Sequence, residues 1–528
     1  MVQVTYSRMF YTILIEVHPL NGAPLSSTNM YSYPTILLTS LSAWVLTIIA
    51  YRLLFSPLRK FPGPLLAAVT YFYEGYFDLV GNGSFLSHIE HLHAQYGPVI
   101  RVGPNTLHFS NPEAYADIYT QGTFNKSRRL YDCFFHAYES SVAFLEPEKS
   151  RLRRNLLNPL FSRRAILNLR HVIQAKVDRF VLLMKNHPDG GPIDFSLAIR
   201  ALTMEVITSY CFASSYAPLE YPDFRHPLVV GNLQFINNFS SMKWLLPLFR
   251  LGLAIPHSII KRANNPVLTA YIEMKQDFED RIERYLQDES TLENEEHETI
   301  FHHLILPQTK EGINRSLRPS KKSLIDEAFM LIGAGSDTVA NACGIGLVHA
   351  LSDVSIGRKL KEELRQAWPD EDSPLELHLL EQLPYLTAFI KEALRTSYGV
   401  VTPLPRVVGP SGATIGGVHI PGGTDVQMSS VFLHDNPTVF QDPKTFSPER
   451  WLVSDTRIME SYLVPFSKGP RMCLGINLAW CELYLILGNI FRRLDLTLYD
   501  TTVEDFKNFK DTFVPAWSKH IKVTVNPS

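Results

Sequence analysis

The chain has 528 residues, of which 45% are hydrophobic and 19% are charged, so it can bury a large core and lacks the composition of a disordered protein. Its formal net charge of -2 gives no electrostatic reason to expect a nucleic acid as a partner. The five cysteines are odd in number and scattered, which argues against a disulfide framework and for a reducing compartment; they are Cys133, Cys211, Cys343, Cys473 and Cys481.

An apolar segment near the N-terminus, residues 34–55, predicts a transmembrane anchor. It reads PTILLTSLSAWVLTIIAYRLLF, carries Arg52 as its only charge, and is about as long as a helix needs to be to cross the hydrocarbon core. A buried core helix would show a polar stripe, which this segment lacks. A cleaved signal peptide would have a shorter apolar run closer to the first residue.

The charges around this segment predict its orientation. Arg52, Arg59 and Lys60 follow the span, whereas residues 1–33, an N-terminal extension without an assigned role, carry only Arg8 as a full positive charge. The positive-inside tendency therefore places the chain after residue 56 in the cytosol. Residues 56–64 read SPLRKFPGP, and their prolines predict a stiff hinge that does not continue the helix.

Two short strands are predicted within residues 96–109. Apolar and polar residues alternate there between turn signals, and Gly103-Pro104 marks the turn that joins the strands. After about residue 145 the hydrophobic periodicity is mainly helical.

A long apolar helix is predicted over residues 323–351, and two glycines interrupt its middle. The interruption reads Gly333-Ala334-Gly335-Ser336-Asp337-Thr338. Each glycine costs a helix interior about 1 kcal/mol relative to alanine, so two glycines at this place need a reason. Close packing against a neighbouring helix is one reason, because small residues permit it.

Further along the chain, Glu392 and Arg395 lie three residues apart and share one face of a predicted helix. They can therefore form an ion pair. If the pair were solvated it would contribute little to stability.

The segment from Phe466 to Gly475 reads FSKGPRMCLG and places a single cysteine on a loop flanked by glycines. An apolar helix is predicted directly after it, over residues 476–490, and its N-terminus favours the thiolate form of Cys473. A lone thiolate without neighbouring cysteines points to haem iron rather than to zinc or an iron–sulfur cluster. The alternative is a buried structural cysteine beside a helix.

This segment carries a family resemblance. Phe466, Gly469, Arg471, Cys473 and Gly475 reproduce the F-x-x-G-x-R-x-C-x-G signature of cytochrome P450 monooxygenases, which Ala479 and Glu482 continue. Length alone would favour two or more domains. The resemblance instead implies a mainly α cytochrome P450 fold with small β-sheets: one catalytic domain over residues 65–528, after one N-terminal transmembrane helix.

The resemblance also implies roles at the centre of the site. Cys473 is the implied axial ligand of haem b, in a loop where Phe466, Gly469 and Gly475 lie against the cofactor. Ala334, Gly335, Asp337 and Thr338 match the family's A-G-x-D-T pattern, which implies a groove over the haem where dioxygen binds. Thr338 is then expected to hydrogen-bond the oxygen, and Asp337 to relay protons from water.

A structural network and cationic partners for the haem propionates follow in the same way. Arg450 in Phe446-Ser-Pro-Glu-Arg-Trp451 is implied to join Glu392 and Arg395 in a buried network that braces the cysteine loop. Arg471 and Arg406 are implied propionate ligands. Arg154 is the third implied propionate ligand, because many relatives carry an aromatic residue four positions before this arginine. Ser150 occupies that position here, so Arg153 remains an alternative.

As a whole, the resemblance implies a haem-thiolate monooxygenase of the endoplasmic reticulum membrane, similar to fungal P450s of secondary metabolism. Electrons are expected from NADPH through a membrane-bound reductase, and the substrate is expected to be a terpenoid or polyketide intermediate. A fatty acid or xenobiotic hydroxylase, an isomerase or dehydratase of the same fold, and a haem-binding sensor are the alternatives. Implied substrate contacts come from residues 131–144, 235–249, 329–333, 401–404 and 513–517.

Overall fold

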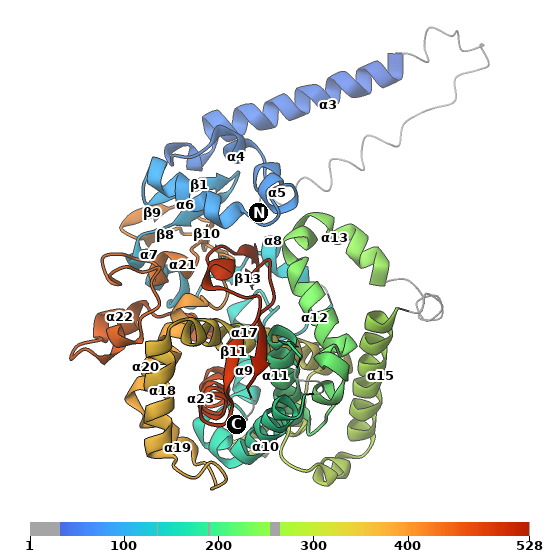
Figure 1. Cartoon of the computed structure of the whole chain (residues 1–528). Coiled ribbons are helices and arrows are strands. Elements are labelled where there is room, and N and C mark those ends of the chain that lie inside the picture. The colour runs from blue at the N-terminus through green and yellow to red at the C-terminus, as the bar shows by residue number, and fades with distance from the viewer. Residues whose placement is uncertain (1–31, 135, 188–190, 254–264, 527–528) are drawn as a thin grey trace. The chain divides into compact units, whose positions relative to one another are not determined.

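A computed structural model describes residues 32–134, 136–187, 191–253 and 265–526 (Figure 1). The chain consists of two compact units, of which the first ends at Arg59 and the second begins at Lys60.

The described part of the first unit is an apolar helix. Helix α3 spans Ser32–Ala50 and continues as a π-helical turn, Tyr51–Phe55. The segment Tyr33–Phe55 is long and apolar enough to cross a membrane, and none of it is buried. The apolar helix expected over residues 34–55 is therefore confirmed, and the expected hinge contains only a short 3-10 turn, Pro57–Lys60.

The second unit is mainly helical, and its helices gather around one long central helix. Its helices are α4 (Leu65–Val69), α5 (Phe72–Leu79), α6 (Phe85–Tyr96), α7 (Pro112–Tyr119), α8 (Arg128–Tyr131), α9 (Pro147–Leu157), α10 (Arg163–Lys185), α11 (Phe195–Phe212), α12 (Pro227–Asn237), α13 (Phe239–Leu253), α15 (Pro266–Gln287), α16 (Ile300–Ile305), α17 (Lys321–Ser352), α18 (Val354–Ala367), α19 (Leu377–Glu381), α20 (Pro384–Thr396), α21 (Val431–His434), α22 (Arg457–Tyr462) and α23 (Ile476–Arg493).

The central helix is α17, which packs against α11, α15, α18, α20 and α23. Ser320 begins it by accepting a hydrogen bond from the Ser323 N–H at 3.1 Å, as an N-cap residue does. Helices α11 and α17 are as apolar as a membrane span, yet most of their length is buried inside the protein. They are core helices, and only the N-terminal segment remains as an exposed apolar helix of that length in the described chain.

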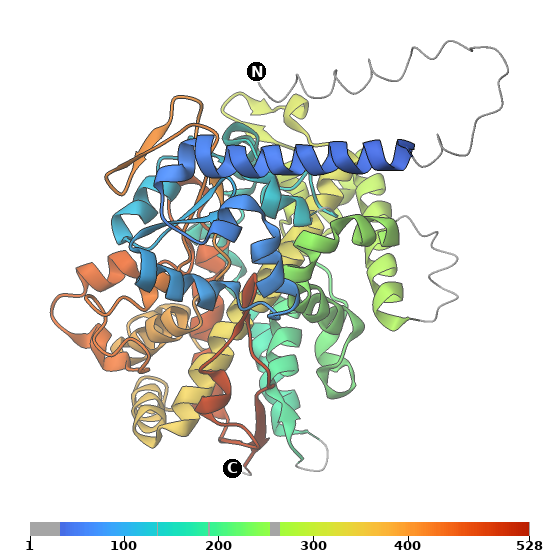
Figure 2. The same ribbon diagram turned by 90° about the horizontal axis from the view of Figure 1, so that it is seen from above.

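The strands form small sheets. The largest has five strands in the order β1-β2-β10-β7-β3 and lies on the side of the unit away from α15 (Figures 1 and 2). Its strands are β1 (Val99–Gly103), β2 (Thr106–Phe109), β10 (Asp425–Gln427), β7 (Arg406–Val407) and β3 (Asn125–Lys126). Strands β1 and β2 are antiparallel, as expected from the pattern of residues 96–109.

The remaining sheets have two or three strands. The three-stranded sheet has the order β11-β14-β4, and the pairs β12-β13, β5-β6 and β8-β9 are antiparallel. These strands are β4 (Ile193–Asp194), β5 (Gln308–Thr309), β6 (Gly312–Ile313), β8 (Ala413–Ile415), β9 (Val418–Ile420), β11 (Leu496–Leu498), β12 (Lys510–Thr512), β13 (Val514–Ala516) and β14 (Lys522–Val525).

Candidate active site

The cysteine loop has a defined backbone geometry. The Cys473 N–H donates to the Phe466 carbonyl at 2.8 Å, and a 3-10 turn over Gly469–Arg471 lies between them. Gly469 has a φ of 73°, and a Cβ there would lie 2.4 Å from the Tyr119 carbonyl oxygen, so only glycine fits. A Cβ on Gly475 would meet no atom within 4 Å, which leaves the space beside the cysteine open.

The Cys473 side chain is accessible and at the same time desolvated. It is exposed in the structure, yet burial among the surrounding protein atoms raises the pKa of its thiol. A hydrogen bond from the Gly475 backbone and the charge of Arg154 oppose this rise without cancelling it. The thiol therefore lines an enclosed space. The sequence predicts that the N-terminus of the following helix holds Cys473 as the thiolate, but in the structure burial outweighs the hydrogen bond from Gly475 at that N-terminus and raises the pKa of the thiol.

The residues around Cys473 fit a haem. Within the described ranges, no group of three or more His, Cys, Asp or Glu side chains could hold a metal ion. An iron bound by Cys473 must therefore bring its other ligands with it, as the iron of a porphyrin does.

Three arginines lie close enough to interact electrostatically: Arg406, Arg471 and Arg154, of which Arg154 also interacts with the Cys473 thiol. Arg406 donates to the Tyr131 hydroxyl at 3.1 Å, and Arg471 donates to the Phe144 and Leu145 carbonyls at 3.1 and 3.2 Å. Burial, then the charges of Arg406 and Arg154, lowers the pKa of Arg471 to about 10. Since none of the three arginines forms an ion pair with a carboxylate of the described chain, the cluster suits the two carboxylates of a haem.

Helix α9 turns Arg153 and Arg154 to different neighbours. Arg153 forms a buried ion pair with Glu327 at 2.7 Å and donates to the Ser323 hydroxyl at 2.7 Å. The Arg154 side chain has neither an ion pair nor a hydrogen bond within the described residues, and it interacts with Cys473 electrostatically. Ser150, in the position where many relatives have an aromatic residue, is buried and donates to the Ser141 carbonyl at 3.2 Å. Of the two alternatives, Arg154 is the one that remains available to an anion.

The middle of α17 presents two different faces. Ala334 is exposed although most of the helix is buried, and the Thr338 hydroxyl donates to the Ala334 carbonyl at 3.1 Å. Residues four apart share one face, so Ala334 and Thr338 border the same open space. Gly335 faces the other way, because a Cβ there would lie 2.6 Å from Ile207 of α11. Close packing, the alternative that the sequence left open, accounts for Gly335.

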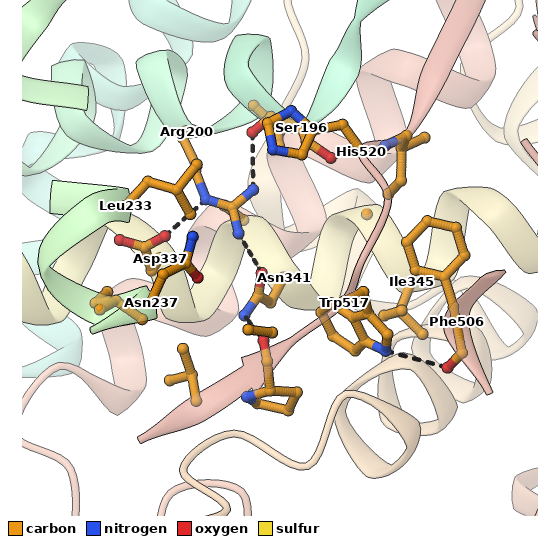
Figure 3. A pocket seen from close by; sticks show the side chains of 18 of the residues that line it. Ser196, Arg200, Leu233, Asn237, Asp337, Asn341, Ile345, Phe506, Trp517 and His520 are labelled. Carbon is orange, nitrogen blue, oxygen red and sulfur yellow. Dashed lines mark hydrogen bonds and ion pairs between the residues drawn. The ribbon is translucent and has the colours of Figure 1, made fainter. Parts of the chain in front are cut away.

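Asp337 also faces α11 and α12. Its carboxylate is ion-paired with Arg200 at 2.6 Å and accepts a hydrogen bond from the Asn232 side chain. Arg200 is held by the Asn341 side chain at 2.6 Å and by the Ser196 carbonyl at 2.8 Å (Figure 3). Neither Arg200 nor Asn232 could be predicted as a site residue from the sequence, since neither belongs to a recognisable motif.

A partly open cleft lies between α11, α12, α17 and the segment from Phe506 to Ile521, and its lining includes Ser196, Arg200, Asp337 and Asn341 (Figure 3). It offers about 50 Å³ to water-sized molecules, which is room for a few waters. Trp517 lies in this cleft, where its ring N–H donates to the Phe506 carbonyl. The substrate contact expected at Trp517 stays a prediction, and in the structure Trp517 lies in this cleft rather than among the apolar side chains around Met330.

The bracing network predicted from short motifs is present. Glu392 and Arg395 form a fully buried pair at 2.8 Å, and Arg450 reaches Glu392 at 3.0 Å. The Arg395 guanidinium also donates to the His434 carbonyl at 2.9 Å, and the Val464 N–H donates to the His434 ring at 2.8 Å. Val464 lies two residues before Phe466, so the network reaches the start of the cysteine loop.

Aromatic and apolar side chains cover the α17 face at Met330, one turn before Ala334. They come from four of the segments expected to contact substrate, and the Phe239 and Phe513 rings lie 4.8 Å apart. His136 stands edge-on to Phe235. This distal cluster consists of Leu130, Tyr131, Cys133, Phe134, Ala137, Ala143, Phe239, Met242 and Met330, with Val142, Leu145, Phe235, Phe249, Leu404 and Phe513 packed against it.

Comparisons with known proteins agree with this site. The family model for cytochrome P450 matches residues 69–523. A tryptophan 6-hydroxylase of Fusarium equiseti is 35% identical over 90% of this chain and 93% of the relative. An N-acetyltryptophan 6-hydroxylase of Emericella nidulans is 34% identical over 93% of this chain and 97% of the relative. A cytochrome P450 monooxygenase of Sordaria araneosa is 34% identical over 89% of this chain and 93% of the relative.

Proposed function

The chain belongs to the cytochrome P450 family and is a monooxygenase, and we propose that Cys473 supplies the axial thiolate of its haem. The observation that carries this proposal is a Cys473 thiol that is accessible but desolvated, in a chain whose described residues contain no group of three or more His, Cys, Asp or Glu side chains that could hold a metal ion. When bound, the haem supplies the activation of dioxygen, from which one oxygen atom enters the substrate and the other leaves as water. Arg154, Arg406 and Arg471 would neutralise its carboxylates.

We assign proton supply to α17. Thr338 would offer its hydroxyl proton to the reacting centre, because it borders the open face at Ala334. Asp337 would take protons from water in the cleft and pass them on, because its carboxylate lies in the wall of that cleft. The ion pair with Arg200 holds this carboxylate in its resting position, so relay requires the pair to loosen.

The electron source and the location in the cell are part of the proposal. The sequence has no flavin or nicotinamide motif, so electrons would come from NADPH through a membrane-bound reductase. The exposed apolar helix α3 supports anchoring in the endoplasmic reticulum membrane as a single span, with the catalytic unit in the cytosol. Basic residues near the cysteine loop, among them Lys468, suit an acidic reductase surface.

For the substrate we propose a hydrophobic intermediate of fungal secondary metabolism. A terpenoid or polyketide fits the apolar character of the distal cluster. An aromatic amino-acid derivative is a second candidate, because two relatives are named as hydroxylases of tryptophan and N-acetyltryptophan. The relatives are named as monooxygenases or hydroxylases, and this supports oxygenation over isomerisation, dehydration or sensing.

The proposed reaction is tested by co-expressing the chain with a reductase in microsomes. Tryptophan, N-acetyltryptophan and fractionated terpenoid and polyketide extracts are supplied in turn, and products are identified by mass. We expect one substrate class to gain a single oxygen atom, labelled when ¹⁸O₂ is supplied, and only in the presence of NADPH. A product formed without NADPH or without the label would contradict monooxygenation.

A further inference from the structure

The first half of helix α13 has one apolar and one charged face. Phe239 and Met242 lie three residues apart and are buried in the distal cluster. Ser240 and Lys243 have the same spacing but contact other elements. The Ser240 hydroxyl donates to the Asp511 backbone carbonyl of β12, and the Lys243 ammonium pairs with carboxylates of α5. The contacts of the charged face therefore fix where the apolar face lies.

The Lys243 ammonium lies between two carboxylates of α5. It is 2.9 Å from Glu74 and 2.8 Å from Asp78, and only 11% of the lysine side chain is exposed. The neighbouring Trp244 ring N–H donates to Asp78 at 2.9 Å, and Arg129 of α8 reaches Glu74 at 2.5 Å. Removal of one partner from a buried ion pair is strongly destabilising, so these contacts bind α13 firmly to α5.

The pKa values in this cluster indicate which pair is the firmer one. Burial alone would raise the pKa of Glu74, but the charges of Arg129 and Lys243 lower it to about 2. Burial alone would lower the pKa of Lys243, but the charges of Glu74 and Asp78 raise it. At Asp78 burial outweighs the charge of Lys243 and raises the pKa to about 6. The pair of Lys243 with Glu74 is therefore the main ionic contact between the two helices.

Helix α13 bends directly after these contacts. Leu245 has a φ of -106° and a ψ of 16°, which are not helical, and Pro247 lies inside the helix. A proline has no N–H to donate to the carbonyl four residues earlier, which here belongs to Lys243. The backbone supports this turn weakly, so side-chain contacts hold the first half of α13 in place. Gly75 of α5 permits a close approach there, because a Cβ would lie 3.2 Å from the Trp244 ring.

We propose that Lys243 is a positioning residue that limits the size of the ligands that reach the haem. Its ion pairs with α5 hold Phe239 and Met242 in the distal cluster. A large apolar molecule enters when this half of α13 moves away, whereas a small molecule passes without such a movement. The inference rests on the haem binding and the substrate segments proposed above.

The test compares Lys243→Met, Lys243→Arg and the control Lys176→Met, all as substrate-free, reduced holoenzymes. Lys176 of α10 pairs with the buried Glu205 of α11 at 3.0 Å, so its replacement also breaks an ion pair, but one outside the distal cluster. Association of methyl isocyanide and of adamantyl isocyanide with the haem iron is followed by stopped-flow absorbance. Both ligands are uncharged and bind iron through the same carbon atom, so the ratio of their rates reports ligand size.

We expect adamantyl isocyanide to associate at least about tenfold faster with Lys243→Met than with the wild type, because loss of the buried pair increases the fraction of molecules in which α13 has moved away. Methyl isocyanide should stay within about twofold. Lys243→Arg keeps the charge and should restore the wild-type ratio. Glu74→Gln weakens the same pair from the other side and should raise the adamantyl rate, which keeps the proposal testable where Lys243→Met loads haem poorly.

An unchanged ratio of the two rates in Lys243→Met and Glu74→Gln would overturn the proposal. An equal rise for both isocyanides, or the same change of ratio in Lys176→Met, would also overturn it, because general loosening of the fold would then explain the result. A wild type without the red-shifted carbon monoxide band of thiolate-bound haem would instead contradict the proposed function.

Discussion

The carboxylate of Asp337 is ion-paired with Arg200 of α11, with 2.6 Å between Oδ1 and Nε, and so faces away from the hydroxyl of its neighbour Thr338. Consecutive residues on a helix do not share a face. Asp337 therefore meets the water cleft, whereas Thr338 meets the open space beside Ala334. In the proposed mechanism this separation would divide proton uptake by Asp337 from proton delivery by Thr338, and it makes the two residues distinguishable by mutation.

Replacement of Thr338 by alanine removes the hydroxyl that faces the open space. We expect product formed per NADPH consumed to fall by at least about tenfold, with the missing electrons recovered as hydrogen peroxide, because a positioned proton donor contributes about 10²–10⁴-fold. NADPH, product and peroxide are measured in the same reaction. Thr338→Ser keeps the hydroxyl and should stay well coupled. Tight coupling in Thr338→Ala would refute the role of Thr338.

Replacement of Arg200 by methionine leaves the buried Asp337 carboxylate without its cation. We expect the free energy of unfolding to fall by about 3–5 kcal/mol, because breaking a buried pair strands a charge. The double variant Arg200→Met/Asp337→Asn removes both charges. Its loss in the free energy of unfolding should therefore be smaller than the sum of the losses in the two single variants. Chemical denaturation of all four proteins gives the coupling energy. A coupling energy near zero would show that the pair is not formed in solution.

The Glu392 carboxylate is fully buried, pairs with Arg395 and Arg450, and accepts a hydrogen bond from the Trp451 ring N–H. Glu392→Gln should destabilise the protein by about 3–5 kcal/mol, because the buried Arg395 loses its nearest carboxylate and keeps only the more distant Asp435, at 3.8 Å, as an ion-pair partner in the described chain. The exposed control Glu504→Gln should change the free energy of unfolding by less than about 0.5 kcal/mol. Equal effects of the two variants in a denaturant titration would contradict the bracing role.

The same carboxylate predicts a dependence of stability on pH. Burial alone would raise the pKa of Glu392, but hydrogen bonds and charges from Arg395 and Arg450 outweigh it, so the pKa lies below its ordinary 4.5. A lowered pKa means that this contribution is complete above pH 4.5 and is lost as the pH falls through the folded value. As the pH falls below about 4.5 towards the folded pKa, the wild type should lose stability more steeply than Glu392→Gln. Parallel curves for the two proteins would contradict this assignment.

The sequence predicts those parts of the site that lie close together along the chain. The helix over 323–351, the cysteine loop and the pair of Glu392 with Arg395 depend on short spacings, and the structure has them as expected. Arg450 could be predicted as a member of this network only because the segment from Phe446 to Trp451 resembles a family motif. These features are set by local periodicity and turn chemistry, which a single sequence displays.

Contacts between distant segments could not be predicted in this way. Arg200 lies 137 residues before Asp337, and no pattern connects them. Gly335 is explained by Ile207 of α11, which only the packing of two helices brings close. The choice between Arg153 and Arg154 depends on the rotation of α9 about its axis, which Glu327 fixes from α17.

Thiolate ligation by Cys473 is tested most directly by the difference spectrum of the reduced, carbon monoxide-bound protein. The wild type and the control Cys481→Ala, which alters a buried cysteine of α23, should show the strongly red-shifted Soret band of a thiolate ligand. Cys473→Ala should lack this band even where it retains haem. An unchanged red-shifted band in Cys473→Ala would contradict the account.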